Sequence, residues 1–253
     1  SVDMLGFEKL MKEQKNKART SANFNLKNKK INWNIVSEES SDFIGYDKHS
    51  CESKIIAYAL EGDLVYLELD KTPFYFESGG QVADRGEIYN KTFTLKVLDV
   101  QKNNGRICHI TKIDKGAFSP EEEKVMSEIN TDKRINIMSN HTATHLLHQS
   151  LINILGSHIQ QAGSLVDSDR LRFDFTHNKK LTKDQILKIE NSINTQIKNK
   201  INLDVTTVDY DTAIKEGALA LFGEKYSEDV RVVNVSGFSK ELCGGTHVKN
   251  TGD

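Results

Sequence analysis

Short apolar runs separated by turn residues dominate the chain from about residue 40 to about residue 116. The apolar runs are KIIAYAL, LVYLEL, TFTLKVLDVQ and RICHITKI, and the turn sequences among them are EGD, SGG, YNK and NNG. Runs of this length with tight turns are typical of consecutive antiparallel strands. The pattern therefore predicts a small antiparallel β-barrel or sandwich, with no long helix in this stretch.

Helical spacing appears on both sides of these predicted strands. Residues 3–19 carry apolar side chains at positions i, i+3 and i+4, which predicts an amphipathic helix followed by a polar linker. Pro120 and the three glutamates after it suit the first turn of a helix, which we expect to run through about Asn130. A second helix is predicted over about 131–155, ending before Gly156.

Strands and helices intermix in the rest of the chain. GSLV, RLRFDF, DVTTVDY and DVRVVNV have the pattern of strands, whereas residues 182–199 and the sequence DTAIKEGALALFG have that of helices. The lack of a regular βαβ rhythm favours an α+β architecture. We expect a helical leader and linker over 1–38, a small antiparallel β-barrel over 39–117, and an α/β sandwich core over 118–253.

Composition excludes several classes of protein. The 253 residues are 37% hydrophobic and 28% charged, and no run approaches the ~20 apolar residues of a membrane span. Because no run is long enough to span a membrane, we expect no membrane partner. Three scattered cysteines do not form a disulfide framework, so we also expect a reducing compartment. The net charge of −2 means that any contact with nucleic acid depends on local patches.

Two pairs of residues point to metal chemistry. His141 and His145 are four residues apart in a predicted helix, so both imidazoles lie on one face within reach of one ion. In Cys243-Gly-Gly-Thr-His247, two glycines let a thiol and an imidazole turn toward one centre. Together these side chains can form the tetrahedral site that Zn²⁺ favours. Alternatively, the histidines are ordinary helix residues and Cys243 is a buried small hydrophobe.

Other polar residues narrow the chemistry. Thr142 stands where a zinc-protease helix places its catalytic glutamate, which argues against a metalloprotease. His148 could be a partner of the metal ligands, a substitute ligand or a surface residue. Gln161 precedes a predicted strand, where its amide could contact a sugar or a carbonyl. Gly79 and Gly80 could offer backbone N–H groups to a ligand or simply form a turn; the P-loop ending that ATP binding needs is missing.

Several segments together resemble one family. They are, in order, TPFYFESGGQVADRG, NHTATHLLHQSL, HIQQAGSLV, DRLRFDF, GALALFGEKY and ELCGGTHVKNTGD. Over residues 40–253 they resemble the editing region of alanyl-tRNA synthetase, which is related to free-standing AlaX-type proteins and to the editing domain of threonyl-tRNA synthetase. The leader and the end of the chain favour a fragment of the synthetase.

The resemblance implies a hydrolase. The expected activity is deacylation of Ser-tRNA(Ala) and Gly-tRNA(Ala), in a cytoplasmic protein that contacts the tRNA(Ala) acceptor end. Such a fragment lacks the aminoacylation core, and we expect it to be monomeric when isolated. A second site is physically necessary because one methyl group gives only about 1–3 kcal/mol of discrimination in a binding pocket. The alternatives are a tRNA acceptor-end binding module with a structural zinc, and a zinc hydrolase acting on another substrate.

The resemblance also assigns residues. The family's zinc ligands fall on His141, His145, Cys243 and His247. Its pocket residues, with catalytic and substrate-binding roles, fall on Thr144 and Gln161. Its glycine motif near the tRNA acceptor end falls on Gly79 and Gly80.

Overall fold

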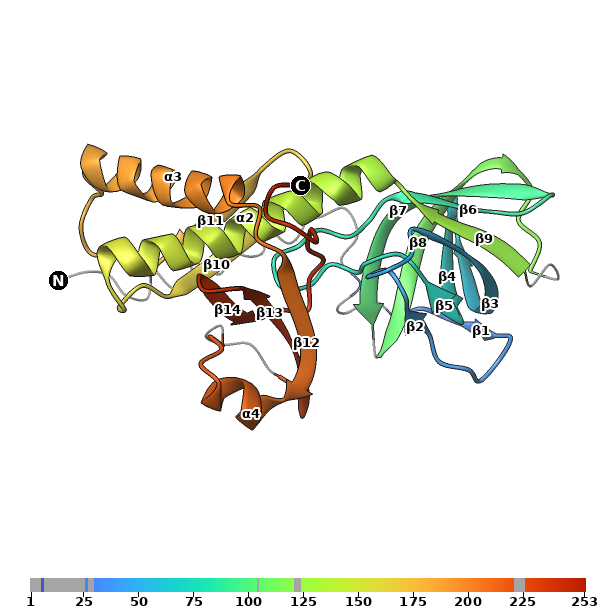
Figure 1. Ribbon diagram of the computed structural model, residues 1–253. Coiled ribbons are helices and arrows are strands. Elements are labelled where there is room, and N and C mark those ends of the chain that lie inside the picture. Colours follow the sequence, from blue (N-terminus) through green and yellow to red (C-terminus); the bar gives the residue numbers. More distant parts are fainter. Residues whose placement is uncertain (1–5, 7–25, 27–29, 104, 121–123, 221–225) are drawn as a thin grey trace. The chain divides into compact units, whose positions relative to one another are not determined.

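The computed structural model describes residues 6, 26, 30–103, 105–120, 124–220 and 226–253, and apart from Gly6 the helix expected over 3–19 lies outside these. The described chain is a mixture of helices and a larger share of strands, which confirms the predicted α+β class (Figure 1). It forms two compact units. Of the described residues, the first unit contains those up to Phe74 together with those of Arg85–Glu128, and the second contains Tyr75–Asp84 together with those of Ile129–Asp253.

The first unit is a closed six-stranded β-barrel, as the spacing of the apolar runs predicted. Its strands follow the order β3-β4-β8-β7-β6-β9, and β9 pairs back with β3 to close the sheet. Two short strands, β1 and β2, precede the barrel strands in the chain. Strand β1 pairs antiparallel with β3, and the short β5 pairs in parallel with β2. The bounds are β1 (Asn34–Ile35), β2 (Asp42–Phe43), β3 (Ser50–Glu61), β4 (Leu64–Leu69), β5 (Lys71–Thr72), β6 (Gly86–Tyr89), β7 (Phe93–Asn103), β8 (Arg106–Gly116) and β9 (Lys124–Ile129).

The prediction of a helix after Pro120 is wrong, because the structure has strand β9 over Lys124–Ile129. Val125, Ser127 and Ile129 are buried while the residues between them are more exposed, which is the period of a strand. The Ser127 hydroxyl lies 2.9 Å from that of Ser53 on β3. Closing the barrel satisfies the backbone groups of two open edges, and this long-range gain outweighs the local helix signals.

A histidine lies in the core of the barrel. His109 is fully buried; its Nδ1–H donates to the Leu67 carbonyl (3.1 Å), and the Thr72 hydroxyl donates to its Nε2 (2.8 Å). Thr72 Oγ1 in turn accepts from the Phe74 N–H. Burial lowers the pKa of His109 from 6.5 to about 4, and the bond to the carbonyl only partly opposes this. His109 is therefore held neutral in the folded barrel.

We expect the barrel to lose stability as the pH falls from 6.5 toward 4. Below pH 6.5 the unfolded state binds a proton that the folded state excludes, which removes about 2 kcal/mol of stability between pH 7 and pH 5. His109→Gln, which keeps a donor and an acceptor but does not titrate, should reduce this pH dependence. Urea denaturation of both proteins at the two pH values measures it, and equal pH dependence would contradict the prediction.

The second unit is built on a long helix (Figure 1). Helix α2 (Thr131–Leu155) begins after Asn130, whose side chain accepts from the Lys133 N–H, and it ends at Gly156. The other elements are the hairpin β10 (Gln161–Val166) and β11 (Leu171–Phe175), helix α3 (Lys183–Lys198), the sheet β12 (Leu203–Asp209), β13 (Asp229–Val235) and β14 (Ser239–Leu242), and helix α4 (Tyr210–Lys215). None of the helices in the described ranges has the length and apolar character needed to cross a membrane.

Most sequence predictions for this unit are confirmed. The helices expected over 131–155 and 182–199 are present, as are the four expected strands. The helix expected from DTAIKEGALALFG is too long, since α4 ends at Lys215 and Gly217 has a left-handed φ of 83°. Leu219 then forms two backbone hydrogen bonds with β14, each 2.9 Å long. Up to residue 220, pairing with this strand takes the place of further helical turns, and the rest of the expected helix lies outside the described residues.

The segment Tyr75–Asp84, which contains the glycine motif, belongs to the second unit rather than to the barrel segment in which the sequence analysis placed it. It lies beside β10, where the Val166 N–H donates to the Gly80 carbonyl (2.7 Å) and the Val82 N–H donates to the Val166 carbonyl (3.0 Å). The chain thus leaves the barrel for ten residues, adds a strand-like segment to the second unit, and returns. We call residues 75–84 the glycine segment.

Candidate metal centre

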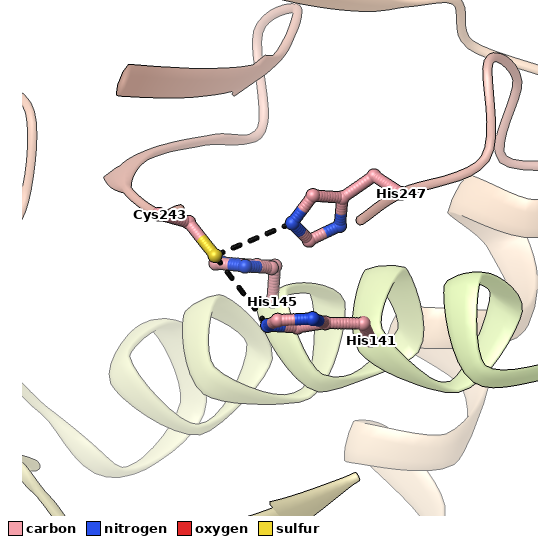
Figure 2. Close-up of side chains that lie close together, drawn as sticks. All are labelled: His141, His145, Cys243 and His247. Carbon is pink, nitrogen blue, oxygen red and sulfur yellow. Dashed lines mark hydrogen bonds between the residues drawn. The ribbon is translucent and has the colours of Figure 1, made fainter. Parts of the chain in front are cut away.

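Four predicted ligands meet at one point in the second unit. His141 and His145 project from successive turns of α2 with nearly parallel rings, and Cys243 and His247 come from the loop after β14 (Figure 2). One ligand atom from each residue lies within 4.8 Å of the others. The three imidazoles are buried and Cys243 is partly exposed.

The spacing of these atoms fits a metal ion. Cys243 Sγ is 3.4 Å from His141 Nε2 and 3.3 Å from His247 Nε2. Around a tetrahedral zinc, bond lengths of about 2.0–2.3 Å place neighbouring ligand atoms about 3.3–3.6 Å apart. His145 Nε2 is buried and has no hydrogen-bond partner within the protein. Such an atom is costly to bury unless a further group satisfies it, and a metal ion would do so.

The outer nitrogen of each histidine has a partner. His–metal sites generally hold the ring in place through this second nitrogen, which also fixes the tautomer. The three pairs are His141 Nδ1 with Gln81 Oε1 (2.8 Å), His145 Nδ1 with Glu241 Oε2 (2.7 Å), and His247 Nδ1 with Thr142 Oγ1 (3.2 Å). The Nε2 atoms of His141 and His247 face Cys243 Sγ.

Electrostatics favours ionised Cys243. Burial opposes loss of the proton, but the neighbouring His141, His247 and His145 outweigh it and hold the pKa of the thiol well below 9.0. Burial, with the charge on His141, lowers the pKa of His247 to about 3. Burial also opposes the charged form of His145, but Glu241 and Cys243 outweigh it and raise the pKa of His145 well above 6.5. A thiolate and a neutral imidazole are the forms in which these side chains coordinate metals.

Glu241 is a member of the site that sequence reasoning missed. Burial would raise the pKa of this carboxyl, but the charge and hydrogen bond of His145 and the hydrogen bond of His148 lower it to about 2. His148 Nδ1 lies 3.1 Å from Glu241 Oε1, so His148 contacts the partner of a predicted ligand. The sequence signal that could have identified Glu241 is its spacing from Cys243, because residues two apart in an extended segment lie on the same face.

The loop that carries Cys243 and His247 is held by hydrogen bonds to strand β13. Arg231 on β13 donates to the carbonyls of Cys243 (3.1 Å) and Gly245 (2.7 Å). The Cys243 N–H also donates to the Arg231 carbonyl (2.9 Å). These contacts fix the loop against the sheet, so the ligands are positioned by regular structure.

A cavity of about 320 Å³ adjoins the candidate metal centre. Its lining includes the predicted pocket residues Thr144 and Gln161, the predicted glycine Gly79, and three of the predicted ligands. The Thr144 hydroxyl donates to the Asn140 carbonyl (2.8 Å). Gly80 packs against β10, where a side chain would meet Ser164 at 2.8 Å, and its φ of 83° also favours glycine. The structure therefore brings the predicted residues into one region of the second unit.

The sequence matches two related families. The family described as tRNA synthetases class II (A) matches residues 1–133, and the threonyl and alanyl tRNA synthetase second additional domain matches residues 230–253. The chain belongs to the class II (A) tRNA synthetases. The second match covers the loop with Cys243 and His247, so this synthetase chain carries half of its candidate metal centre in a segment typical of the threonyl and alanyl enzymes.

Relatives of this synthetase chain are alanine–tRNA ligases. That of Caldicellulosiruptor saccharolyticus is 47% identical, covering 99% of this chain and 30% of its own length. Those of Fusobacterium nucleatum (47% identity; 97% and 29%) and Legionella pneumophila strain Corby (43%; 100% and 30%) are similar. The resemblance to alanyl-tRNA synthetase is confirmed. The chain spans about 30% of the length of these relatives.

Proposed function

We propose that the second unit is a zinc-containing editing site that deacylates Ser-tRNA(Ala) and Gly-tRNA(Ala) within alanyl-tRNA synthetase. The observation that carries the proposal is the convergence of three Nε2 atoms and one thiol beside a cavity that contains Thr144 and Gln161. The proposal includes the acceptor end of tRNA(Ala) as partner, with Gly79 and Gly80 near it, and the cytoplasm as location.

The charges of the site support a divalent ion. The Cys243 thiolate and the Glu241 carboxylate together carry −2, and the metal-facing imidazoles are neutral when they coordinate. A bound Zn²⁺ would balance this charge in a buried region, where a net charge is costly. His141, His145, Cys243 and His247 would hold the ion.

The reaction is the hydrolysis of an ester. Water adds to the ester carbonyl and the bond to the ribose oxygen breaks, giving a free amino acid, a free ribose hydroxyl and a proton. When bound, zinc supplies positive charge that can stabilise the negative charge developing on the carbonyl oxygen. Gln161 lines the cavity and offers an amide that can orient the ester or the water.

Thr144 provides a basis for selecting serine. Because its hydroxyl proton is used in the bond to the Asn140 carbonyl, its oxygen is left to accept a hydrogen bond from the seryl hydroxyl. Alanine lacks that hydroxyl, so the Thr144 oxygen would accept no hydrogen bond from the substrate and alanine would be held less well. Glycine also lacks it, so this contact accounts for serine selection alone.

The second candidate is a tRNA acceptor-end binding module with a structural zinc. It is favoured by the presence of four protein ligand atoms, because a closed tetrahedral set is typical of structural zinc sites. This candidate predicts metal-dependent folding or tRNA binding without ester hydrolysis.

A deacylation assay separates the two candidates. We expect the zinc-loaded chain at high concentration to release serine from Ser-tRNA(Ala) while sparing Ala-tRNA(Ala), and chelation to abolish release. Cys243→Ala should lower the rate by about 10²-fold or more. The matched control is Cys51→Ala, which changes a cysteine of the barrel and should leave the rate unchanged.

Two results would count against this account. Release no faster than the spontaneous rate, from protein that binds zinc, would favour the structural module. In the same assay Thr144→Val should reduce the preference for serine over alanine, and an unchanged preference would remove Thr144 from the selection of serine.

A further inference from the structure

The glycine segment places one side chain deep in the second unit. Gln81 is completely buried, and its position follows from the pairing of Gly80 and Val82 with Val166 on β10. The segment also turns tightly, with Ser78 and Gln81 joined by hydrogen bonds in both directions. A buried amide must find partners for its oxygen and its nitrogen, and Gln81 finds them beside the candidate metal centre.

The partners of Gln81 define its orientation. The Thr246 backbone N–H donates at 2.9 Å to one end of the amide, so this end must be the oxygen, Oε1. The amide nitrogen then donates to the Thr246 hydroxyl at 2.9 Å. Because Oε1 can only accept, His141 must place its proton on Nδ1 to bond with it at 2.8 Å. His141 Nε2 is thereby left with a lone pair facing Cys243 Sγ.

We infer that Gln81 is a positioning residue that fixes the tautomer and ring orientation of His141 for metal binding. The glycine segment then has a role inside the metal centre, in addition to the role near the tRNA acceptor end proposed for Gly79 and Gly80. This inference rests on the proposed metal site. It makes the ligand set depend on residues from four parts of the chain: the glycine segment, α2, β14 and the loop after β14.

The inference predicts an order of metal affinities among Gln81 variants. Gln81→Met keeps the size of the side chain but removes the acceptor, so it should weaken Zn²⁺ binding about 10–100-fold. Gln81→Glu keeps an acceptor for His141 and for the Thr246 N–H, and the Thr246 hydroxyl can rotate to donate to it. The Zn²⁺ affinity of Gln81→Glu should therefore stay within about tenfold of that of the unchanged protein. This loss is smaller than the about 10–100-fold loss that removal of an outer partner produces.

The measurement is competition for Zn²⁺ between the protein and a chromophoric chelator, with thermal unfolding of the metal-free proteins alongside. Gln149→Met is the matched control, because Gln149 lies on α2 one turn beyond His145 and bonds Asn153 rather than a ligand. It should bind Zn²⁺ as the unchanged chain does. The affinities are compared among variants whose metal-free forms are folded.

Thr246→Val separates positioning from mere support of the loop. It removes the hydroxyl that Gln81 contacts but keeps both hydrogen bonds to Oε1, so the loss of affinity should be smaller than for Gln81→Met. Equal affinity of Gln81→Met and the unchanged chain, or equal losses in Gln81→Met and either Gln81→Glu or Thr246→Val, would overturn the inference. Failure of the unchanged chain to bind Zn²⁺ would instead overturn the proposed metal site.

Discussion

Gly245→Ala should abolish tight Zn²⁺ binding, whereas Gly244→Ala should leave it intact. A methyl group at position 245 would lie 2.0 Å from His141 Cε1, 2.4 Å from its Nδ1 and 3.0 Å from Gln81 Oε1. At position 244 it would meet nothing within 4 Å. The first substitution must displace the His141 ring or the loop that carries Cys243 and His247. We expect the Zn²⁺ affinity of Gly245→Ala to fall by at least about 100-fold. This is the upper end of the loss expected when an outer hydrogen-bond partner of a ligand is removed.

The two alanine variants are controls for each other, since they make the same chemical change in adjacent residues of one loop. Chelator competition gives both affinities, and circular dichroism establishes that the metal-free proteins are folded. Weakened binding in both variants to the same degree would mean that the flexibility of the loop, rather than contact with His141, makes glycine necessary. Unchanged binding in Gly245→Ala would show that His141 is not held in the position described.

Asp84→Asn should destabilise the second unit by about 3–5 kcal/mol, because it removes the negative charge that faces a buried guanidinium. The side chains of Asp84 and Arg134 are 2% and 1% exposed. Arg134 Nε donates to Asp84 Oδ1 (2.9 Å), and a second guanidinium nitrogen contacts Oδ2. Asp84 Oδ2 also accepts from the Tyr75 N–H (2.7 Å), which closes the glycine segment on itself.

Urea denaturation measures the predicted loss through the unfolding transition of the second unit. The control is Asp184→Asn in the exposed Asp184–Lys188 pair of α3, which should change stability by less than about 1 kcal/mol. Replacing Asp84 and Arg134 together by leucine should cost less than Asp84→Asn alone, since both members of the buried ion pair are removed together. A loss below about 1 kcal/mol in Asp84→Asn would contradict the account, because it would match an exposed pair.

The linked positions of Asp84 and Gln81 explain why the glycine segment belongs to the second unit. Asp84 attaches it to the first turn of α2 through Arg134, and Gln81 attaches it to His141 further along that helix. A loss of the ion pair should therefore also weaken metal binding.

The sequence by itself determined the local features of this protein. Two histidines four residues apart on a helix direct both rings to one side, and the two glycines between Cys243 and His247 let both side chains reach a single centre. Period-two runs with tight turns likewise determine strands that pair with their neighbours in the chain. For this reason α2, four of the five strands of the second unit and most barrel strands were predictable, and so was the grouping of His141, His145, Cys243 and His247.

The tertiary structure alone decided which distant segments share a core. Strand β9 replaces a locally favourable helix because the barrel offers it two open edges, and the glycine segment leaves the barrel because its buried polar groups find partners on α2 and beside His247. Gln81 lies 60 residues before His141 in the chain, and Glu241 lies 96 residues after His145. Hydrogen bonds between residues this far apart leave no local period in a single sequence, because they depend on a geometry that exists only after the chain has folded.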